Sequence, residues 1–192
     1  EKKFHLTKEI ENSKILICGY GNISKSLIKI FDKLKLNYEI LSNQEIKSKK
    51  IKSYRYKKLN SIIQKYDIVI NNLSSNIETQ EIFDSTIFNK MQIDVSIISI
   101  GRLNVFKASS LGKFFRKNLN ASLYIDMPEK DISQKDLIGM NKLNNVYISP
   151  HIGGYSKSYW NNEVQLFIKN LKLFLDNKKL INIVNQNKRN FS

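Results

Sequence analysis

Gly19 and Gly21 are the residues near the amino end whose spacing could support chemistry, in the segment Gly-Tyr-Gly-Asn-Ile-Ser at positions 19–24. The first glycine of such a pair permits a sharp turn, and the second lets the backbone approach a diphosphate closely. A helix that starts at this point offers unpaired N–H groups and the positive end of its dipole to an anion. The spacing therefore predicts a site for the phosphates of a dinucleotide.

The flanking segments have the order that such a site needs. Residues 14–18 form a short apolar run that is typical of a buried strand, and residues 38–41 form a second one. Between them, apolar residues recur every three to four positions, which predicts a helix. These residues are Ile23, Leu27, Ile30, Phe31 and Leu34. Strand, glycine turn, helix and strand make a βαβ unit of the dinucleotide-binding kind, and a βαβ turn without a ligand is the alternative.

Two positions depart from the usual dinucleotide fingerprint. Ser24 stands where a third glycine is common, and it is small enough for close packing of helix on strand. The acidic residue expected about 20 positions further on, where it would hold the ribose hydroxyls, is replaced by Ser42. No carboxylate then repels a 2′-phosphate, and three nearby lysines could attract one. They are Lys47, Lys49 and Lys50. NADP is therefore predicted to be at least as suitable as NAD.

The composition is that of a folded protein with one substantial core, since 41% of the 192 residues are hydrophobic. The net charge of +15 could suit nucleic acid, but the lysines are scattered along the chain, so we expect no specific nucleic-acid partner. No apolar run is long enough to cross a membrane, and no signal peptide is visible. Cys18 is the only cysteine, and we expect a buried, inert thiol in a reducing cytoplasm. No metal site is expected.

Strand-like and helix-like segments alternate along the rest of the chain. Compact apolar runs predict buried parallel strands at residues 67–71, 95–100, 122–125 and 145–149. Helical periodicity predicts helices at residues 59–66, 81–91 and 106–117. A final helix carries an apolar stripe that we interpret as core or interface, formed by Trp160, Val164, Phe167, Ile168, Leu171, Phe174 and Leu175. The predicted fold is α/β, a Rossmann-type doubly wound parallel sheet with helices on both faces.

Three segments together resemble the D-isomer-specific 2-hydroxyacid dehydrogenases, a family that includes phosphoglycerate dehydrogenase. Residues 66–79 resemble that family's strand and loop ending in Pro-Glu-Thr. Residues 91–102 resemble its Met-Lys-x-Gly segment and the strand that leads to a catalytic arginine. Residues 144–154, which contain Pro-His-Ile-Gly-Gly, look very like its catalytic-histidine motif. The resemblance covers nearly the whole chain, and it implies an oxidoreductase that transfers hydride between NAD or NADP and a 2-keto or 2-hydroxy acid.

The resemblance also implies a catalytic set for the reduction of a 2-keto acid. Arg102 would bind the substrate carboxylate, because a planar guanidinium can hold both of its oxygens. His151 would donate the proton, because imidazole ionises near neutral pH. Asp131 would stand beside this histidine in place of the family's glutamate, and Glu129 is the alternative carboxylate.

The cofactor-binding residues implied by the resemblance fall into three groups. Those at the pyrophosphate would be Gly19, Gly21, Asn22 and Ile23. Those at the ribose and adenosine would be Ser42, Leu73 and Ser74. Those on the nicotinamide side would be Ile100, Gly101, Asp126, His151, Gly153 and Gly154.

The resemblance further implies the domain organisation. Residues 1–13 would lead into a nucleotide-binding domain at 14–180, and residues 181–192 would be a stub that returns toward a substrate domain largely absent from this chain. Family members dimerise through the nucleotide-binding domain, so a homodimer is expected. The alternative function is a degenerate, non-catalytic nucleotide-binding or regulatory module, favoured by Ser24, Ser42 and Leu103, the last of which replaces a family glycine.

Overall fold

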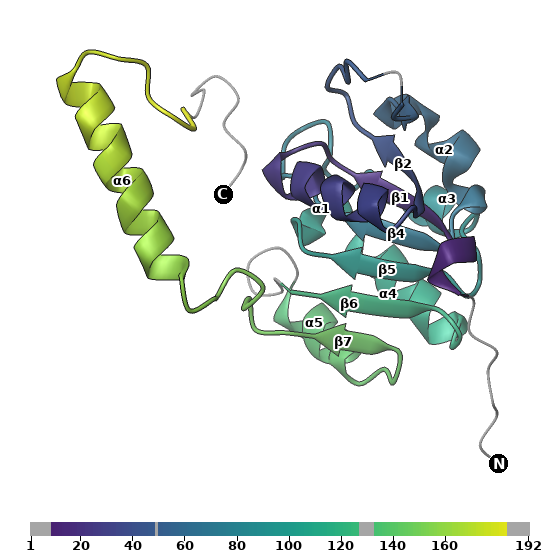
Figure 1. Cartoon of the computed structure of the whole chain (residues 1–192). Helices are drawn as coiled ribbons and strands as arrows, with labels where there is room; N and C mark the ends of the chain where they lie inside the picture. The colour runs from purple at the N-terminus through teal and green to yellow at the C-terminus, as the bar shows by residue number, and fades with distance from the viewer. Residues whose placement is uncertain (1–8, 49, 127–132, 184–192) are drawn as a thin grey trace.

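The first strand, β1 (Lys14–Cys18), lies inside a parallel sheet, where it pairs with β2 (Asn37–Leu41) on one side and β4 (Ile68–Asn71) on the other. The computed structural model describes residues 9–48, 50–126 and 133–183. Within these residues the strand order is β3-β2-β1-β4-β5-β6-β7, and every pair is parallel (Figure 1). The order reverses between β1 and β4, which is the point where such sheets bind ligands at their carboxyl ends.

The remaining strands are short. They are β3 (Ser53–Tyr54), β5 (Ser96–Ser99), β6 (Ser122–Ile125) and β7 (Val146–Ile148). The α-helices are α1 (Asn22–Lys33), α2 (Leu59–Ile62), α3 (Ser85–Phe88), α4 (Ala108–Lys117), α5 (Gln134–Asn141) and α6 (Tyr159–Leu175). Short 3₁₀ helices lie at Ile10–Asn12, Tyr56–Lys58, Ile63–Lys65 and Leu103–Val105.

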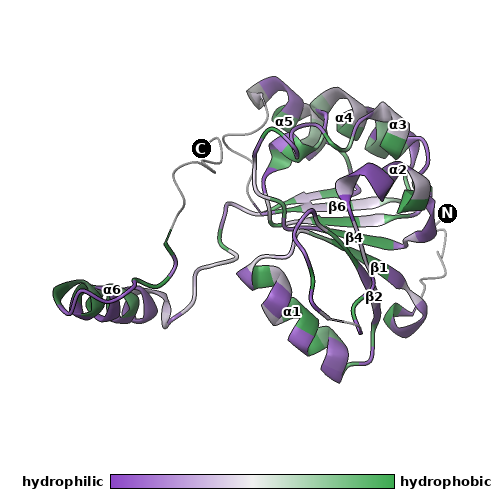
Figure 2. Cartoon of the chain, turned by 90° about the horizontal axis from the view of Figure 1, so that it is seen from above, coloured by the Kyte–Doolittle hydropathy of each residue, from purple (hydrophilic) through white to green (hydrophobic). Residues whose placement is uncertain are grey.

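Helices cover both faces of the sheet, as Figure 2 shows, with α1 below it and α2 to α5 above it. Successive residues of a strand point to opposite faces, so β1 contributes to two separate cores. Ile15 and Ile17 belong to the core under α1, whereas Leu16 and Cys18 belong to the larger core under the other helices. Cys18 is fully buried, as predicted. The predicted doubly wound α/β fold is confirmed.

The helix α6 lies apart from the sheet and its helical layers (Figures 1 and 2). Its apolar stripe is exposed along the whole helix, from 37% at Ile168 to 70% at Trp160. The interpretation of this stripe as core of this chain is therefore wrong, and an interface remains. Among the described residues, no helix is both long and apolar enough to span a membrane.

Several helices and strands differ from the sequence predictions. The helix predicted at 81–91 shortens to α3, because Asp84 caps its first turn by accepting hydrogen bonds from the backbone N–H groups of Thr86 and Ile87. Ahead of that cap, the N–H of Phe83 donates to Val105 instead of continuing a helix. The basic segment 47–58 contains the short strand β3, and α5 was not predicted at all.

A buried carboxylate ties β2 to the segments that lead into β3 and β4. Glu39 is only 5% exposed, accepts a hydrogen bond from the hydroxyl of Tyr66 and forms an ion pair with Lys52 at 2.8 Å. Burial by itself raises the pKa of Glu39, but the hydrogen bonds from Lys52 and Tyr66 outweigh it, so the pKa lies below its usual value. This group is therefore ionised in the fold and depends on its donors.

We expect Tyr66→Phe to lower the free energy of unfolding by about 1–3 kcal/mol, because it removes a donor from a buried carboxylate. Urea denaturation measures this difference. Tyr147→Phe is the matched control, since Tyr147 is 51% exposed and stacks on Tyr124 through its ring. A loss for Tyr66→Phe no larger than the control's would show that the hydroxyl contact contributes nothing.

Candidate functional site

The turn after β1 has the backbone geometry that a phosphate site needs. Gly19 has a φ of 100°, a backbone conformation that residues other than glycine rarely adopt. A Cβ at this position would lie 2.8 Å from the carbonyl oxygen of Asn72. Only glycine therefore lets the turn pass this close to the loop that follows β4.

Gly21 opens the helix α1 toward empty space. It is the N-cap residue, no side chain caps the helix, and a Cβ built on it would meet nothing within 4 Å. The next two residues, Asn22 and Ile23, are exposed. The first N–H groups of a 12-residue helix, uncapped by any side chain, thus lie beside an open cradle. These residues fit the phosphates of a dinucleotide.

Ser24 has a partner that the sequence did not reveal. Its side chain is fully buried, and its Oγ accepts a hydrogen bond from the Nδ2 of Asn72 at 3.0 Å. Asn72 lies in the loop after β4, 48 residues along the chain. The serine in place of the third glycine therefore joins the first turn of α1 to the loop after β4.

Asn71, the last residue of β4, holds the next two loops together. Its buried Nδ2 donates to the Oγ of Ser99 at 2.9 Å and to the backbone carbonyl of Arg102 at 3.1 Å. Its Oδ1 accepts from the N–H of Leu73 at 3.0 Å. Sequence reasoning missed this residue, although a polar side chain at the end of an apolar strand was a usable signal. The contacts fix the backbone of Arg102 at the carboxyl end of β5.

In the loop that carries Arg102, Leu103 stands where the family pattern has a glycine, and the structure accommodates it. Leu103 is fully buried in the larger core, and its φ is not positive. The backbone here does not need glycine. Gly101 does need to be glycine, because a Cβ would lie 2.6 Å from the carbonyl oxygen of Leu73. Arg102 itself is half-buried.

Asp126, just after β6, holds the loop that carries His151. Its carboxylate accepts hydrogen bonds from the N–H of Ile152 at 3.1 Å, from the N–H of Gly153 at 2.7 Å and from the hydroxyl of Ser149. A Cβ on Gly153 would come within 2.4 Å of the same carboxylate. His151 is exposed, with a left-handed φ of 55°. The carboxylate therefore fixes an unusual backbone turn that presents the imidazole to solvent.

We expect this contact to weaken in acid. The hydrogen bond from Ser149 lowers the pKa of Asp126 below its ordinary 3.8. Because the pKa of Asp126 is lower in the folded than in the unfolded chain, the contact stabilises the fold at a pH above the unfolded-state pKa. This stabilisation is lost as the pH falls through the folded-state pKa. In NMR spectra the amide protons of Ile152 and Gly153 should titrate together with a midpoint below 3.8. Asp126→Asn should abolish that titration. If the two amide shifts respond neither to pH nor to this substitution, the assigned contact is wrong.

Most of the predicted residues share one edge of the sheet. The carboxyl ends of β1, β4, β5, β6 and β7 meet there, so the Gly19 turn, Leu73, Arg102, Asp126 and His151 follow one another across it. A hollow of about 200 Å³ at this edge is lined by Ile98, Ser99, Ile100, Tyr124, Ile125, Asp126, Tyr147, Ile148 and Ser149.

The other predicted residues differ in exposure or lie outside the described part of the chain. Ser42 directly follows β2 and is buried, with its Oγ accepting from the N–H of Gln44 at 3.0 Å. Ser74 and Gly154 are exposed. Glu129 and Asp131 lie outside the described residues. Within ranges 9–48, 50–126 and 133–183, no group of three or more metal-ligating side chains is close enough to hold an ion.

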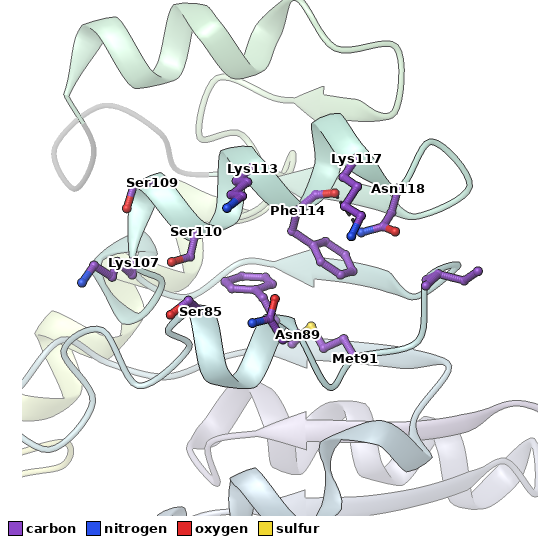
Figure 3. A pocket seen from close by; sticks show the side chains of 12 residues that line it. Ser85, Asn89, Met91, Lys107, Ser109, Ser110, Lys113, Phe114, Lys117 and Asn118 are labelled. Carbon is purple, nitrogen blue, oxygen red and sulfur yellow. Dashed lines mark hydrogen bonds between the residues drawn. The ribbon is translucent and has the colours of Figure 1, made fainter.

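A larger groove lies between α3 and α4, away from these residues (Figure 3). It measures about 510 Å³ and is lined by Ser85, Phe88, Asn89, Met91, Ile93, Lys107, Ser109, Ser110, Lys113, Phe114, Lys117 and Asn118. None of the residues predicted for cofactor or catalysis is among them. The groove is therefore separate from the candidate site.

Comparison with known proteins shows the family of this chain. The model of the family described as D-isomer specific 2-hydroxyacid dehydrogenase, NAD binding domain, matches residues 1–153. The chain belongs to this family. The match includes the glycine turn, Arg102, Asp126 and His151, so the resemblance found in the sequence is confirmed.

Individual relatives are distant. Glyoxylate/hydroxypyruvate reductase HPR3 of Arabidopsis thaliana is 23% identical over 183 residues, which cover 94% of this chain and 55% of that protein. The NAD-complexed D-isomer specific 2-hydroxyacid dehydrogenase of Lactobacillus delbrueckii ssp. bulgaricus superposes with a TM-score of 0.79 at 17% identity, covering 94% of this chain and 58% of its own. A probable 2-hydroxyacid dehydrogenase of Rhizobium etli CFN 42, in complex with NADP, HEPES and L(+)-tartaric acid, superposes with a TM-score of 0.77 at 18% identity. The match covers 96% of this chain and 59% of that one. The chain thus spans little more than half the length of these 2-hydroxyacid dehydrogenase relatives.

Proposed function

We propose that this chain is the nucleotide-binding part of an enzyme that transfers hydride between NAD or NADP and a 2-keto or 2-hydroxy acid. The observation that carries the proposal is the shared edge of the sheet. An open, uncapped helix start at Gly21 lies at one point of this edge, and the loops of Arg102 and His151 follow two further strands of it. Phosphate binding and proton transfer are the two functions that these side chains and backbone groups can supply together.

In this proposal the cofactor lies across the switch point between β1 and β4. Its diphosphate is held by the N–H groups at Gly21, Asn22 and Ile23, where the uncapped helix start favours negative charge. The loop after β4, at Leu73 and Ser74, borders the adenosine. Ile100, Gly101 and Asp126 border the nicotinamide side, together with the loop that ends at Gly154.

The catalytic roles follow from the chemistry of the side chains. Arg102 binds the carboxylate of the acid, and its backbone contact with Asn71 keeps it at the end of β5. His151 gives a proton to the carbonyl oxygen during reduction and takes it back during oxidation. Asp126 is a positioning residue, because it holds the His151 loop through Ile152 and Gly153. The nicotinamide, when bound, supplies or accepts the hydride.

A carboxylate beside His151 completes the proposal. Asp131, or Glu129 in its place, would stabilise the charged imidazole and so favour its role as a proton donor. The side chain of Asp126 is already occupied by three hydrogen bonds from the loop. In this proposal Asp126 holds the loop, and the second acidic residue is assigned to the imidazole.

Oxidation of the coenzyme tests the proposed reaction. The intact protein should consume NADH or NADPH, followed at 340 nm, when glyoxylate or hydroxypyruvate is added, since these two acids give the Arabidopsis relative its name. Pyruvate serves as a second keto acid. Acetate serves as the negative control, because it has a carboxylate but no keto group to reduce. Binding of the coenzyme without turnover on any keto acid would replace this proposal with a non-catalytic nucleotide-binding module.

We also propose a homodimer in which the apolar stripe of α6 is covered. Trp160, Phe167 and Phe174 on this helix are each at least 66% exposed, which is unusual for large apolar side chains in a lone protein. Light scattering after size exclusion should give twice the chain mass, and Phe167→Glu should return it to a monomer. Ile93→Glu is the control, because Ile93 is 68% exposed on another part of the surface. A monomeric wild type would contradict the dimer.

A further inference from the structure

The structure assigns a coenzyme-selecting role to Arg55, a residue that no sequence motif singled out. We infer that its guanidinium binds the 2′-phosphate of NADP, so that the chain prefers NADPH to NADH. This inference rests on the proposed function, because it concerns the adenosine end of the same cofactor site. It replaces the lysines near position 47 as the source of that preference.

Arg55 is brought to the end of β2 by strand pairing. It directly follows β3, whose two residues pair with Ile40 and Leu41 of β2. The N–H of Ser42 donates to the carbonyl of Tyr54 at 2.8 Å and extends this pairing by one step. The register therefore puts Arg55 next to the position where dinucleotide sites select for or against a 2′-phosphate.

Two contacts then anchor the segment of Arg55 to the loop after β2. The Nη1 of Arg55 donates a hydrogen bond to the backbone carbonyl of Asn43. The N–H of the next residue, Tyr56, donates to the Oδ1 of Asn43 at 3.0 Å. The guanidinium is thus held at the loop by one of its five N–H donors, while its side chain is exposed. The other donors are the kind that bind a phosphate through two parallel hydrogen bonds.

No carboxylate occupies the ribose position itself. Ser42 stands there, and its hydroxyl is buried and accepts from the backbone of Gln44. Of the three lysines considered from the sequence, Lys49 lies outside the described residues. Lys47 and Lys50 are exposed and make no hydrogen bond or ion pair with the described residues of this loop. Arg55 is consequently the cation whose contacts place it at the end of β2.

One acidic side chain touches the same loop from the opposite direction. The Nδ2 of Asn43 donates to Glu78 at 3.2 Å, and Glu78 follows β4, on the other side of β1 from β3. The adenosine half of the cofactor extends from the switch point toward β2 and β3. Arg55 follows β3 on that outer side, whereas Glu78 follows β4 on the inner side. Glu78 offers a useful control for this reason.

Titration calorimetry at about 0.15 M salt tests the inference with NADPH, NADH, adenosine 2′,5′-bisphosphate and 5′-AMP. Wild-type protein should bind NADPH roughly tenfold or more tightly than NADH, and the bisphosphate more tightly than 5′-AMP. Arg55→Met should remove both preferences and leave the affinity for NADH within about twofold. Arg55→Lys should restore part of the preference, because it keeps the charge without the planar fork.

Two further variants separate Arg55 from general charge. Lys57→Met removes one positive charge from an exposed position two residues along, and it should weaken both coenzymes by less than about twofold at this salt concentration. Glu78→Gln should leave the preference for NADPH intact or increase it. Thermal melts confirm that each variant is folded.

The outcomes distinguish this inference from the function on which it rests. If NADH binds as tightly as NADPH, or if Arg55→Met weakens the binding of both coenzymes equally, the role inferred for Arg55 is wrong. The proposed nucleotide site is not contradicted by either result. If the folded protein binds neither coenzyme, the nucleotide site itself is wrong, and the role of Arg55 is wrong with it.

Discussion

Replacing Gly21 with aspartate is expected to weaken the binding of NADH and NADPH by roughly 100-fold or more, or about 3 kcal/mol. A Cβ at this position meets no atom of the protein within 4 Å, so the variant should fold normally. Its carboxylate, however, would stand at the open start of α1, where it repels a diphosphate and occupies the space that the diphosphate needs. Titration calorimetry measures the loss, and thermal denaturation checks the fold.

Gly139→Asp provides the matched control for this variant. It makes the same substitution in α5, where a Cβ would be in ordinary contact, 3.6 Å from the guanidinium of Arg116. None of the predicted cofactor residues lies on this helix. The control should bind both coenzymes like the wild type. Equal binding by Gly21→Asp and Gly139→Asp would mean that the helix start does not hold the cofactor.

His151→Gln is expected to slow turnover on a 2-keto acid by roughly 100- to 10,000-fold, the range usual for loss of a general acid. Glutamine keeps a polar side chain of similar length but cannot give up a proton to an alkoxide. The affinity for the coenzyme should change by less than about threefold, because the diphosphate is held at the other end of the site. Single-turnover oxidation of NADPH, with binding measured separately, distinguishes the two effects.

His5→Gln is the natural control, since His5 is the only other histidine in the chain. It should leave turnover unchanged. The account of His151 as proton donor is wrong if its variant keeps wild-type turnover, or if its slower rate comes entirely from weaker coenzyme binding. A change in the pH dependence of turnover should accompany the loss, because the titrating donor has been removed.

Several strands of this fold could be predicted to within one or two residues. Parallel strands are covered on both faces, so they are nearly continuous apolar runs. The segments 14–18, 67–71 and 122–125 have this form, and the observed strands begin and end at or beside these limits. The glycine turn was equally predictable, because the backbone requires glycine at Gly19 and the Gly-x-Gly spacing that ends at Gly21 is visible in the sequence.

Other elements could not be predicted because their stability comes from distant partners. The strand β3 has only two residues, both polar or aromatic, and it exists because it pairs with β2. The helix α5 has a weak apolar stripe. Its start did carry a signal, because Ser133 is a good N-cap residue: its hydroxyl accepts from the N–H of Asp136 and donates to the carboxylate of the same residue.

The residues of the candidate site divide in the same way. Motifs identified Arg102, Asp126 and His151, but neither Asn71 nor the contacts through which Asp126 holds the His151 loop. Asn71 acts on residues about 30 positions away, and Asp126 acts on residues 26 and 27 positions away. Such pairs arise only when parallel strands bring their carboxyl ends together. The folded structure was also needed to find that Ser24 and Leu103, which depart from the family pattern, are both buried without backbone strain.

The central claim is that the carboxyl edge of the sheet binds a nicotinamide dinucleotide at the uncapped start of α1. Titration of the wild-type chain with NADPH and NADH, at about 0.15 M salt so that the net charge of +15 is screened, tests it most directly. The account predicts saturable binding with one coenzyme per chain, accompanied by NMR shifts of the backbone amides at residues 19–24. A folded sample that binds neither coenzyme, or binds them without disturbing these amides, would contradict it.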